Sequence, residues 1–355
     1  MQSGNDENTA LKSLIYNKEI TMVIVESYFL AVIMTVITMI CWGSWANTQK
    51  LATKEWPFQL YYWDYSLGVV ILSLIFAFTL GSFGSAGRPF LADLAQAAAM
   101  ALLLAFIGGA VFNIANILLV ASIDIAGMAV AFPIAIGLAL VLGVITNYVA
   151  TPLGDPVVLF IGVALIVVAI IIDALAYRKL PTTGQKTTAK GIWISIAAGI
   201  LMGFFYRFVA ASMSANFASP EVGKLTPYTA VFIFSLGLFF SNFIWNSIVM
   251  AKPFVGDPVP YGDYFKKGNM RLHLIGILGG IIWNIGMSLN MIAAGTAGFA
   301  ISYGLGQGAT MVAAFWGVFI WKEFKGAPRS TNWLLFLMFL FFITGLLLVI
   351  IARNV

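Results

Sequence analysis

The chain has 355 residues; 61% are hydrophobic and only 9% are charged, with 19 basic and 14 acidic side chains and a formal net charge of +5. Soluble domains carry about 25% charged residues, so this composition excludes a soluble enzyme, a nucleic-acid-binding protein and a disordered scaffold. Because Cys41 and His273 are the single cysteine and the single histidine, we predict no disulfide, no metal site and no cofactor.

The N-terminal segment, residues 1–25, is polar and then weakly amphipathic. It lacks the sequence of basic region, apolar core and small-residue cleavage site that marks a secretory signal peptide. We therefore expect a solvated tail with a short interfacial helix.

Ten apolar runs follow, each long enough to cross a bilayer as a helix. Lipid allows few other structures to an unclosed chain, and the runs are continuously apolar rather than alternating, which argues against a β-barrel. The sequence therefore predicts an all-α integral membrane protein with ten transmembrane helices. The predicted spans lie near residues 27–48, 59–81, 96–120, 125–148, 156–177, 190–212, 227–250, 272–294, 298–321 and 331–352.

The basic residues are distributed unevenly among the loops. Thirteen of the 19 fall in loops that follow odd-numbered spans, against five in the other loops and both tails. Loops rich in Lys and Arg stay in the cytoplasm. We predict that the odd-numbered loops are cytoplasmic, that both termini are extracytoplasmic and that the protein lies in the cell inner membrane.

Spans 3–4 are repeated in spans 8–9. The segment GGAVFNIANILLVASIDIAGMAVAFPIAIG at 108–137 aligns without a gap on 279–308, at a constant offset of 171 residues. Each repeat unit then contains five spans, and an odd number means that the second copy enters the membrane inverted. Inverted repeats are typical of secondary transporters with a solute site at the repeat interface. We predict two inverted five-helix repeats, 26–178 and 190–355, joined by a linker at 179–189.

Several motifs make the chain similar to a known family. PYTAVFIFSLG, VGDPVPYGDYF, HLIGILGGIIWNIG and AISYGLGQGATMVAAFWGVFIWKEFKG in the second half, with IVESYFLAV and WDYS near the start, resemble the ureide permease family of the drug/metabolite transporter superfamily. The resemblance runs from Ile24 to Val355 and is most specific from Pro227 to Gly326. Related carriers in the superfamily transport glucose, ribose or rhamnose.

The resemblance implies a ten-helix carrier in two inverted halves. It also implies proton-coupled uptake of small, neutral, polar heterocycles such as allantoin and uracil, or of sugars as in the relatives. Plant members carry a long cytosolic loop with a nucleotide-binding-like motif, whereas the link from Arg178 to Lys190 is short here and GQKTT is not a phosphate-binding loop. No ATP dependence is carried over.

Ionisable side chains within a membrane span are costly, so they are functional candidates. We predict Asp64 as the proton-coupling carboxyl, with Glu26 second, because both fall on motifs of the resemblance and a partly desolvated carboxyl can exchange protons near neutral pH. A structural role for Asp64, paired with a lysine such as Lys50, is an equal alternative.

Three further ionisable residues lie near or inside the spans. We expect Asp124 in a solvated turn between spans 3 and 4, and Asp173 in a structural ion pair near the end of span 5. Arg207 is the single basic residue in mid-span and is a candidate for substrate contact or for pairing with Asp64 or Asp173.

Neutral polar side chains on the repeated spans are better candidates for solute recognition. Amides offer donors and acceptors that match ureides, pyrimidines and sugar hydroxyls. Interhelical hydrogen bonding is the alternative role for each of them. The candidates are Asn113, Asn116, Asn284, Asn290, Tyr303 and Gln307.

Aromatic residues supply flat surfaces on which a planar solute can stack. We select Trp42 and Trp283, and we also include Tyr206 beside Arg207. Aromatic residues near span ends are expected to be interfacial anchors. These are Trp56, Tyr61, Tyr62, Trp63, Trp321 and Trp333.

The sequence lacks catalytic arrangements: there is no HExxH, no nucleophile elbow and no second His or Cys to pair within the membrane. The predicted function is proton-coupled uptake of a small neutral solute by alternating access. The predicted partners are this solute, protons and the lipid bilayer, not nucleic acid; the oligomeric state, for instance a homodimer, stays open. Alternatives are a sugar–proton symporter or a metabolite or drug exporter of the same fold, and, from another class, a membrane enzyme or lipid scramblase.

Overall fold

The computed structural model describes residues 21–52, 55–180 and 188–355. In these ranges the regular structure is helical, with two isolated β-bridges, and ten helical segments are long and apolar enough to cross a membrane. The prediction of an all-α membrane protein with ten transmembrane helices is therefore confirmed. The spans are α2 with α3 (Tyr28–Ser44, Ala46–Ala52), α4 (Phe58–Phe78), α6 (Ala99–Ala126), α7 (Met128–Ala150), α8 (Pro156–Tyr177), α9 (Ala189–Ser212), α10 (Pro227–Ala251), α12 (Met270–Ala297), α13 with α14 and η1 (Phe299–Gly306, Ala309–Phe315, Trp316–Ile320) and α15 (Ser330–Ile351).

Polar residues mark the starts of several spans. The side chains of Ser27, Asp155, Thr188 and Asn269 each accept a hydrogen bond from a backbone N–H in the first turn of the helix that follows. Such caps satisfy donors that have no partner within the helix. The N-terminal ends of α2, α8, α9 and α12 are therefore fixed by local sequence.

The third span is longer than the sequence predicts. Helix α6 continues to Ala126 and ends at Gly127, whose φ of 78° is favourable only for glycine. Asp124 consequently lies in the last turn of α6, and the expectation that it occupies a turn between spans was wrong. Gly298, 171 residues later, ends α12 in the same way with a φ of 87°.

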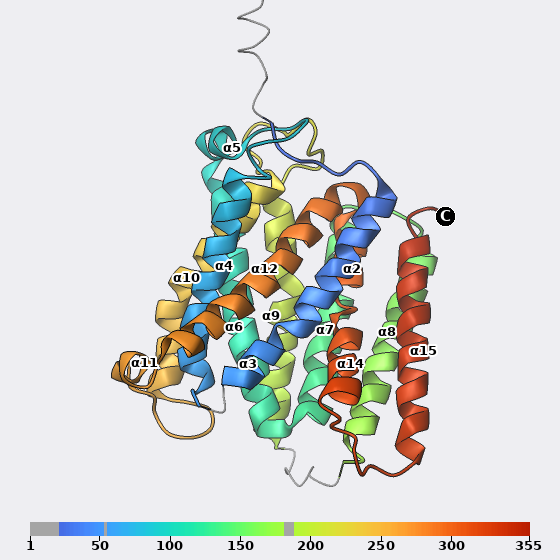
Figure 1. Cartoon of the computed structure of the whole chain (residues 1–355). Coiled ribbons are helices and arrows are strands. Elements are labelled where there is room, and N and C mark those ends of the chain that lie inside the picture. Colours follow the sequence, from blue (N-terminus) through green and yellow to red (C-terminus); the bar gives the residue numbers. More distant parts are fainter. Residues whose placement is uncertain (1–20, 53–54, 181–187) are drawn as a thin grey trace, which may run out of the picture.

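The helix packing pairs each half of the chain with the other. Helix α6 packs on α9 and α10, and its counterpart α12 packs on α2 and α4. In the same way α7 contacts α9, and its counterparts α13 and α14 contact α2. Helices α8 and α15 lie side by side at one edge of the bundle (Figure 1). Each pair has a counterpart five spans later, as expected of two related halves.

Glycines allow two of these pairs to cross closely. A Cβ at Gly68 of α4 would clash with the backbone carbonyl of Ile277 in α12, and a Cβ at Gly237 of α10 would clash with that of Phe106 in α6. Ile277 follows Phe106 by the repeat offset of 171 residues. Small residues let backbones approach in this way where lipid supplies no hydrophobic driving force.

Both ends of the described chain lie at the same end of the bundle (Figure 1). Met22 pairs with Ala86 in the connection before α5 (Phe90–Gln96), and the Tyr28 hydroxyl donates to the carbonyl of Ile350 in α15. We name this the terminal end. Of the tail and linker expected in residues 1–25 and 179–189, residues 1–20 and 181–187 lie outside the described chain.

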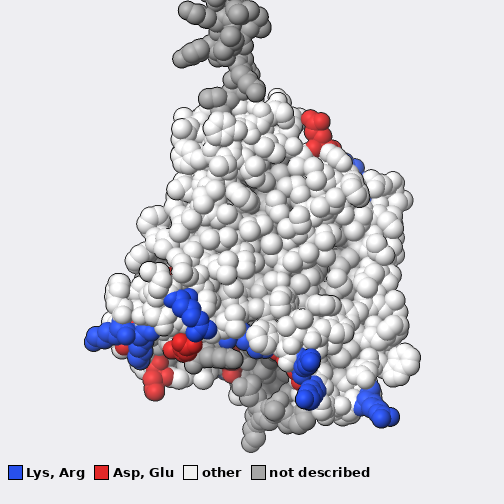
Figure 2. Space-filling model, viewed as in Figure 1, with Lys and Arg blue, Asp and Glu red and all other residues white. Residues whose placement is uncertain are grey.

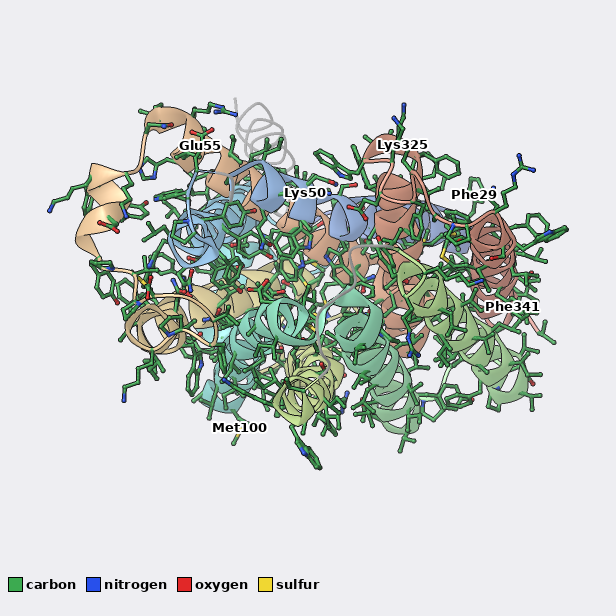
Figure 3. All side chains as sticks on the ribbon, turned by 90° about the horizontal axis from the view of Figure 1, so that it is seen from below. Phe29, Lys50, Glu55, Met100, Lys325 and Phe341 are labelled. Atoms are coloured by element: carbon green, nitrogen blue, oxygen red, sulfur yellow. The ribbon has the colours of Figure 1, made fainter. Side chains whose placement is uncertain are left out.

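Charged residues gather at the opposite end. Figure 2 shows Lys and Arg along the lower rim of the molecule and an uncharged surface over its side. Seen from that rim, Phe29 and Met100 project from the periphery (Figure 3), and their exposed fractions are 74% and 63%. We name this the basic end; the uncharged side between the two ends is suited to lipid.

Three aromatic residues expected to be interfacial anchors are instead buried. Trp56, Tyr61 and Tyr62 have exposed fractions of 1% or less. The Trp56 ring packs edge-on against His273 at 5.0 Å, and the Tyr61 hydroxyl lies 2.7 Å from that of Thr48. The start of α4 is covered by α3, α12 and the short helix α11 (Gly262–Lys266), so the interfacial expectation was wrong for these three residues.

Candidate functional site: a cavity open at the basic end

A cavity of about 440 Å³ lies inside the bundle and reaches the surface at the basic end. Its mouth is formed by helix ends and includes Lys50, Asp124 and Tyr177, and its inner wall is reached by Trp42 of α2 and Trp283 of α12. The volume falls in the range of small-molecule sites. Nine aromatic side chains contribute to the lining: Trp42, Trp45, Phe112, Phe132, Tyr177, Phe205, Trp283, Trp316 and Trp321.

The inner wall is an aromatic cluster from both halves of the chain. Trp42 and Trp283 stack with ring centroids 5.9 Å apart and an angle of 13°, and the Trp42 indole N–H donates to the Trp283 carbonyl at 3.1 Å. Phe112 of α6 packs on Trp283 at 4.4 Å, and Phe205 of α9 packs on Phe112 at 5.0 Å. Flat rings held in this way offer a stacking surface.

Polar groups stand beside this aromatic wall. The Asn116 amide donates to the Tyr62 hydroxyl at 3.1 Å, whereas the Gln307 side chain, 8% exposed, makes no hydrogen bond with a described residue. Gln307 and Gly308 interrupt the ninth span between α13 and α14. Interrupted helices are typical of transporter solute sites, because they place free polar groups inside the membrane.

The mouth carries a charged cluster. Glu323 accepts hydrogen bonds from Lys50 at 2.6 Å and from the Tyr177 hydroxyl at 2.8 Å. Asp173, one helical turn before Tyr177, also lines the cavity and is 93% buried. Lys50 thus pairs with Glu323 and not with Asp64, contrary to the alternative considered for Asp64.

Asp64 lies outside the cavity lining, between α4, α11 and α12. Its Oδ1 accepts from the Tyr264 hydroxyl at 2.5 Å and its Oδ2 lies 2.8 Å from Nδ1 of His273. The carboxyl is 2% exposed. Burial and the adjacent Asp64 carboxylate raise the pKa of the Tyr264 phenol, so it stays a hydrogen-bond donor at neutral pH.

Two of the selected asparagines cross-link helices. The Asn113 amide donates to the Leu238 carbonyl of α10 at 3.2 Å, and the Asn284 amide donates to the Val69 carbonyl of α4 at 2.8 Å. Neither side chain lines the cavity. Both join the third span of one half to the second span of the other.

Further buried hydrogen bonds close the bundle beyond the aromatic wall. The Tyr206 hydroxyl donates to Asn290 at 2.6 Å, and the Asn290 amide donates to the carbonyl of Ser302 at 2.8 Å. The Tyr303 hydroxyl donates to carbonyls of α7 and α9. Tyr206 and Asn290 follow the cavity residues Phe205 and Trp283 along their helices toward the terminal end, so the cavity does not extend past them.

The two remaining candidates lie away from the cavity. Glu26 is exposed and precedes α2 at the terminal end. Arg207 is partly buried in α9 and forms no hydrogen bond or ion pair with the residues that the structure describes. The expected pairing of Arg207 with Asp64 or Asp173 is therefore absent from this conformation.

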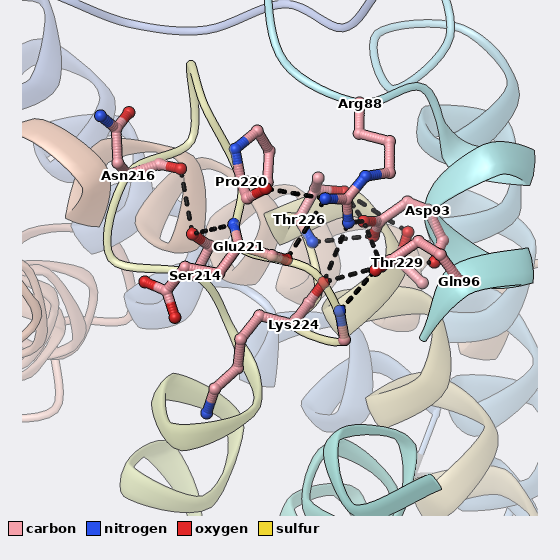
Figure 4. A network of polar contacts seen from close by, with 11 residues as sticks. Arg88, Asp93, Gln96, Ser214, Asn216, Pro220, Glu221, Lys224, Thr226 and Thr229 are labelled. Carbon is pink, nitrogen blue, oxygen red and sulfur yellow. Dashed lines mark hydrogen bonds and ion pairs between the residues drawn. The ribbon is translucent and has the colours of Figure 1, made fainter. Parts of the chain in front are cut away.

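A polar network seals the terminal end (Figure 4). Asp93 of α5 accepts from Arg88 at 2.9 Å and from the backbone and hydroxyl of Thr226 at 2.8 and 3.0 Å. Arg88 also donates to the Pro220 carbonyl at 2.7 Å, and Gln96 bonds Gly223 and Lys224. The network joins the connection before α6 to the connection before α10.

A cavity of this size inside a ten-helix bundle, open at one end and sealed at the other, is the geometry of a solute carrier. A family model described as Ureide permease matches residues 61–180 and 178–352. The chain belongs to the ureide permease family. Members of this family are transporters, so the protein is a multi-pass membrane transporter and not an enzyme.

Individual relatives agree with this assignment. Ureide permease 2 of Arabidopsis thaliana is 25% identical over 91% of this chain and 97% of its own length, and ureide permease 1 of the same plant is 24% identical over the same shares. Transmembrane protein 144 homolog B of Dictyostelium discoideum is 27% identical over 50% of this chain and 44% of its own. A solved structure titled "Crystal structure of protein" has a TM-score of 0.55 at 14% identity, covering 93% of this chain and 100% of that chain, which shows a shared fold alone.

Several residues that line the cavity were not selected from the sequence. Thr310 carries no distinguishing signal in an apolar helix, and Glu323 lies in a loop whose basic residues served only to predict the topology. Asp173 could have been found, because a carboxyl inside a predicted span is already a functional candidate. Its assignment to an ion pair hid that signal: the structure shows no base bonded to it within the described residues.

Proposed function

We propose that the protein is a secondary active transporter that takes up a small, neutral, polar solute, such as a nucleobase, a ureide or a nucleoside, by alternating access. The single observation that carries the proposal is the cavity between the two halves, with an aromatic wall and an amide side chain at a helix break. The similarity of this chain to relatives named ureide permeases supports this solute class.

The lining matches the solute class chemically. A planar heterocycle can stack against the Trp42–Trp283 wall, while its alternating N–H and C=O edge meets Gln307 and Asn116. The Gln307 amide supplies both a donor and an acceptor that are not used within the described protein. A carboxylate solute is disfavoured because the described lining contains Asp124, Asp173 and Glu323 against one basic residue, Lys50.

We infer that 26–178 and 190–355 are two inverted repeats that rock about the cavity. The matched crossings of α4 with α12 and of α6 with α10 support this inference. The conformation described is open at the basic end; by the positive-inside rule that end faces the cytoplasm. In the opposite conformation the Arg88–Asp93 network opens and the mouth closes.

Coupling to protons is assigned to Asp64. It is buried between the halves and bonded to the single histidine, and imidazole is the side chain that most readily changes charge between pH 5 and 8. A proton gained here changes an interaction that crosses from α4 to α11 and α12. Glu26, which is exposed at the terminal end, is the less favoured second proton site, and Arg207 the less favoured solute contact.

Uptake into reconstituted vesicles tests the proposal. Radiolabelled uracil, allantoin, uridine, glucose and ribose are offered with and without an inward proton gradient. We expect accumulation of one of the nitrogenous solutes that rises with the gradient and is abolished by an uncoupler. Asp64→Asn should lose accumulation yet retain solute exchange. If only sugars accumulate, the proposed solute class is wrong. If uptake does not depend on the proton gradient, the proposed proton coupling is wrong.

A matched pair of substitutions tests the cavity. Gln307→Met keeps the side-chain length but removes its donor and acceptor, which lowers solute affinity about three- to tenfold if one hydrogen bond is lost. Gln59→Met makes the same change at the start of α4, outside the cavity, and should leave affinity unchanged. Equal behaviour of the two variants would exclude Gln307 from solute binding.

A further inference from the structure

Asp173 is a buried carboxyl at the cavity wall with an oxygen that nothing in the described protein satisfies. It lies in α8, is 93% buried, and its Oδ1 has no hydrogen-bond partner. The residue lines the cavity that we assign to the solute. A buried polar atom without a partner is uncommon in folded proteins and calls for an explanation.

Two other carboxyls, those of Asp124 and Glu323, line the cavity with Asp173, and Arg178 and Lys179 follow at the end of α8. Glu323, from the connection between η1 and α15, lines the same cavity and accepts from Tyr177, one turn after Asp173 on α8. Lys50 of α3 bonds Glu323 at 2.6 Å, and Asp124 of α6 lines the same cavity. The helices packed on α8 contribute no further charge, because α15 and α7 contain none; the one titratable group of α7, Tyr148, bonds Gly154 near the terminal end.

Ionised and protonated Asp173 differ in how they fit this place. An ionised carboxylate that lacks a donor for one oxygen is costly to bury, and a second carboxylate beside it adds repulsion. One proton bound to Asp173 removes both the cost of burying its charge and the repulsion from Glu323. Lys50, the one basic residue among the described residues that line the cavity, is already paired with Glu323, so it does not neutralise both carboxylates.

We propose that Asp173 is a second proton-binding site of the transport cycle, placed in the solute cavity and separate from Asp64. The proposal rests on the transport function proposed above. A proton bound to Asp173 removes the like charge next to Glu323, so α8 and the connection after η1 can approach and the mouth can close. Loss of that proton restores the repulsion and favours the open mouth seen here.

Glu323 is held at the mouth from two sides. Lys50 holds Glu323 from the first half of the chain, while Tyr177 holds it from α8. Protonation of Asp173 leaves the Lys50–Glu323 pair in place. In the proposed step one proton passes from water in the cavity to a carboxylate oxygen of Asp173, and no other reactant takes part.

Two measurements on full-length protein test the proposal. Infrared difference spectra between pH 5 and 8 report the carbonyl band of protonated carboxyl groups without any solute. Vesicles then report both exchange and gradient-driven accumulation of radiolabelled uracil. The test variant is Asp173→Asn. The matched control is Asp155→Asn, which removes a carboxyl at the other end of α8 and leaves an asparagine that can still cap the helix.

We expect Asp173→Asn to lose one titrating carboxyl band and at least tenfold of uracil accumulation while exchange stays within twofold of wild type; Asp155→Asn should match wild type throughout. An unchanged band pattern in Asp173→Asn, or undiminished accumulation, would overturn the proposal. If wild type fails to exchange uracil, allantoin and uridine alike, the solute assignment fails instead, and the infrared result alone then decides whether Asp173 binds a proton.

Discussion

The two ends of the bundle use equivalent positions to make different contacts. Asp93 on α5 and Tyr264 on α11 are 171 residues apart, the offset of the internal repeat. Asp93 bonds Thr226 at the start of α10, and Tyr264 bonds Asp64 in the first turns of α4. In both cases a short helix before a long span holds the second span of the other half.

The chemistry of the two contacts differs in what a proton can do. At the terminal end a guanidinium pairs with Asp93, and Arg keeps its charge at every physiological pH. At the basic end the partner of Asp64 is an imidazole, which is charged only when protonated. The comparison separates a contact to a permanently charged partner, which we call the fixed latch, from a contact to a histidine, which we call the second latch.

The orientation of the two ends gives the largest expected effect, an all-or-none difference in labelling. In a Cys41→Ala background, Val222→Cys places a thiol at the terminal end and Phe265→Cys at the basic end; the native side chains are 90% and 82% exposed. An impermeant maleimide applied to intact cells should label only the Val222→Cys variant. Phe265→Cys should react after permeabilisation. The reverse pattern would invert the predicted topology.

Removal of the fixed latch gives the next largest effect, a loss of stability. Asp93→Ala leaves the Arg88 guanidinium and both Thr226 donors without their acceptor, and breaking such a buried pair costs about 3–5 kcal/mol. The apparent melting temperature of purified protein should fall on the order of 10 °C. Glu221→Gln, an exposed charge at the same end, is the control. A deficit no larger than that of Glu221→Gln would show that the network is dispensable.

The fold could be predicted because each span is a continuous apolar run, and lipid leaves few alternatives to a helix. The end of α6 was missed because Asp124 suggested a loop, whereas the helix continues until Gly127 permits a positive φ. Composition alone does not show where a helix in a membrane stops if the last turn can face a watery cavity.

Some of the residues selected from the sequence line the cavity and others do not. Trp42, Trp283, Asn116 and Gln307 line the cavity, while the repeat pair Asn113 and Asn284 cross-links helices. A residue that is identical in both halves, such as this asparagine, is one that both halves use for helix packing. The cavity surface is asymmetric with respect to the repeat: the counterparts of Asn116 and Gln307 are Met287 and Ile136.

The contacts at the basic end could not be predicted from spacing. Lys50 and Glu323 are 273 residues apart, and Asp64 and His273 are 209 apart. Their pairing depends on how the halves dock, and a single sequence does not contain that geometry.

The smallest expected effect comes from the second latch and uses the phenol of Tyr264. Tyr264→Phe keeps the ring but removes the hydrogen bond to Asp64, so we expect a loss of about 1 kcal/mol of stability near neutral pH. The pKa of Tyr264 is raised in the folded protein. Above about pH 10 an unfolded tyrosine ionises, which favours unfolding of wild type but not of the variant.

The stability deficit of Tyr264→Phe should therefore be constant between pH 6 and 9 and should narrow as the pH rises beyond 10. Denaturation of both proteins across this range measures it. In an Asp64→Asn background the deficit should shrink, because the phenol then donates to a neutral amide. An equal deficit in both backgrounds, or one that widens at alkaline pH, would mean that the Tyr264 hydroxyl stabilises the basic end without Asp64, so that this contact is not the counterpart of the Asp93 latch. No deficit at all would mean that Tyr264 acts through ring packing on Trp56 and His273, which the Phe variant keeps.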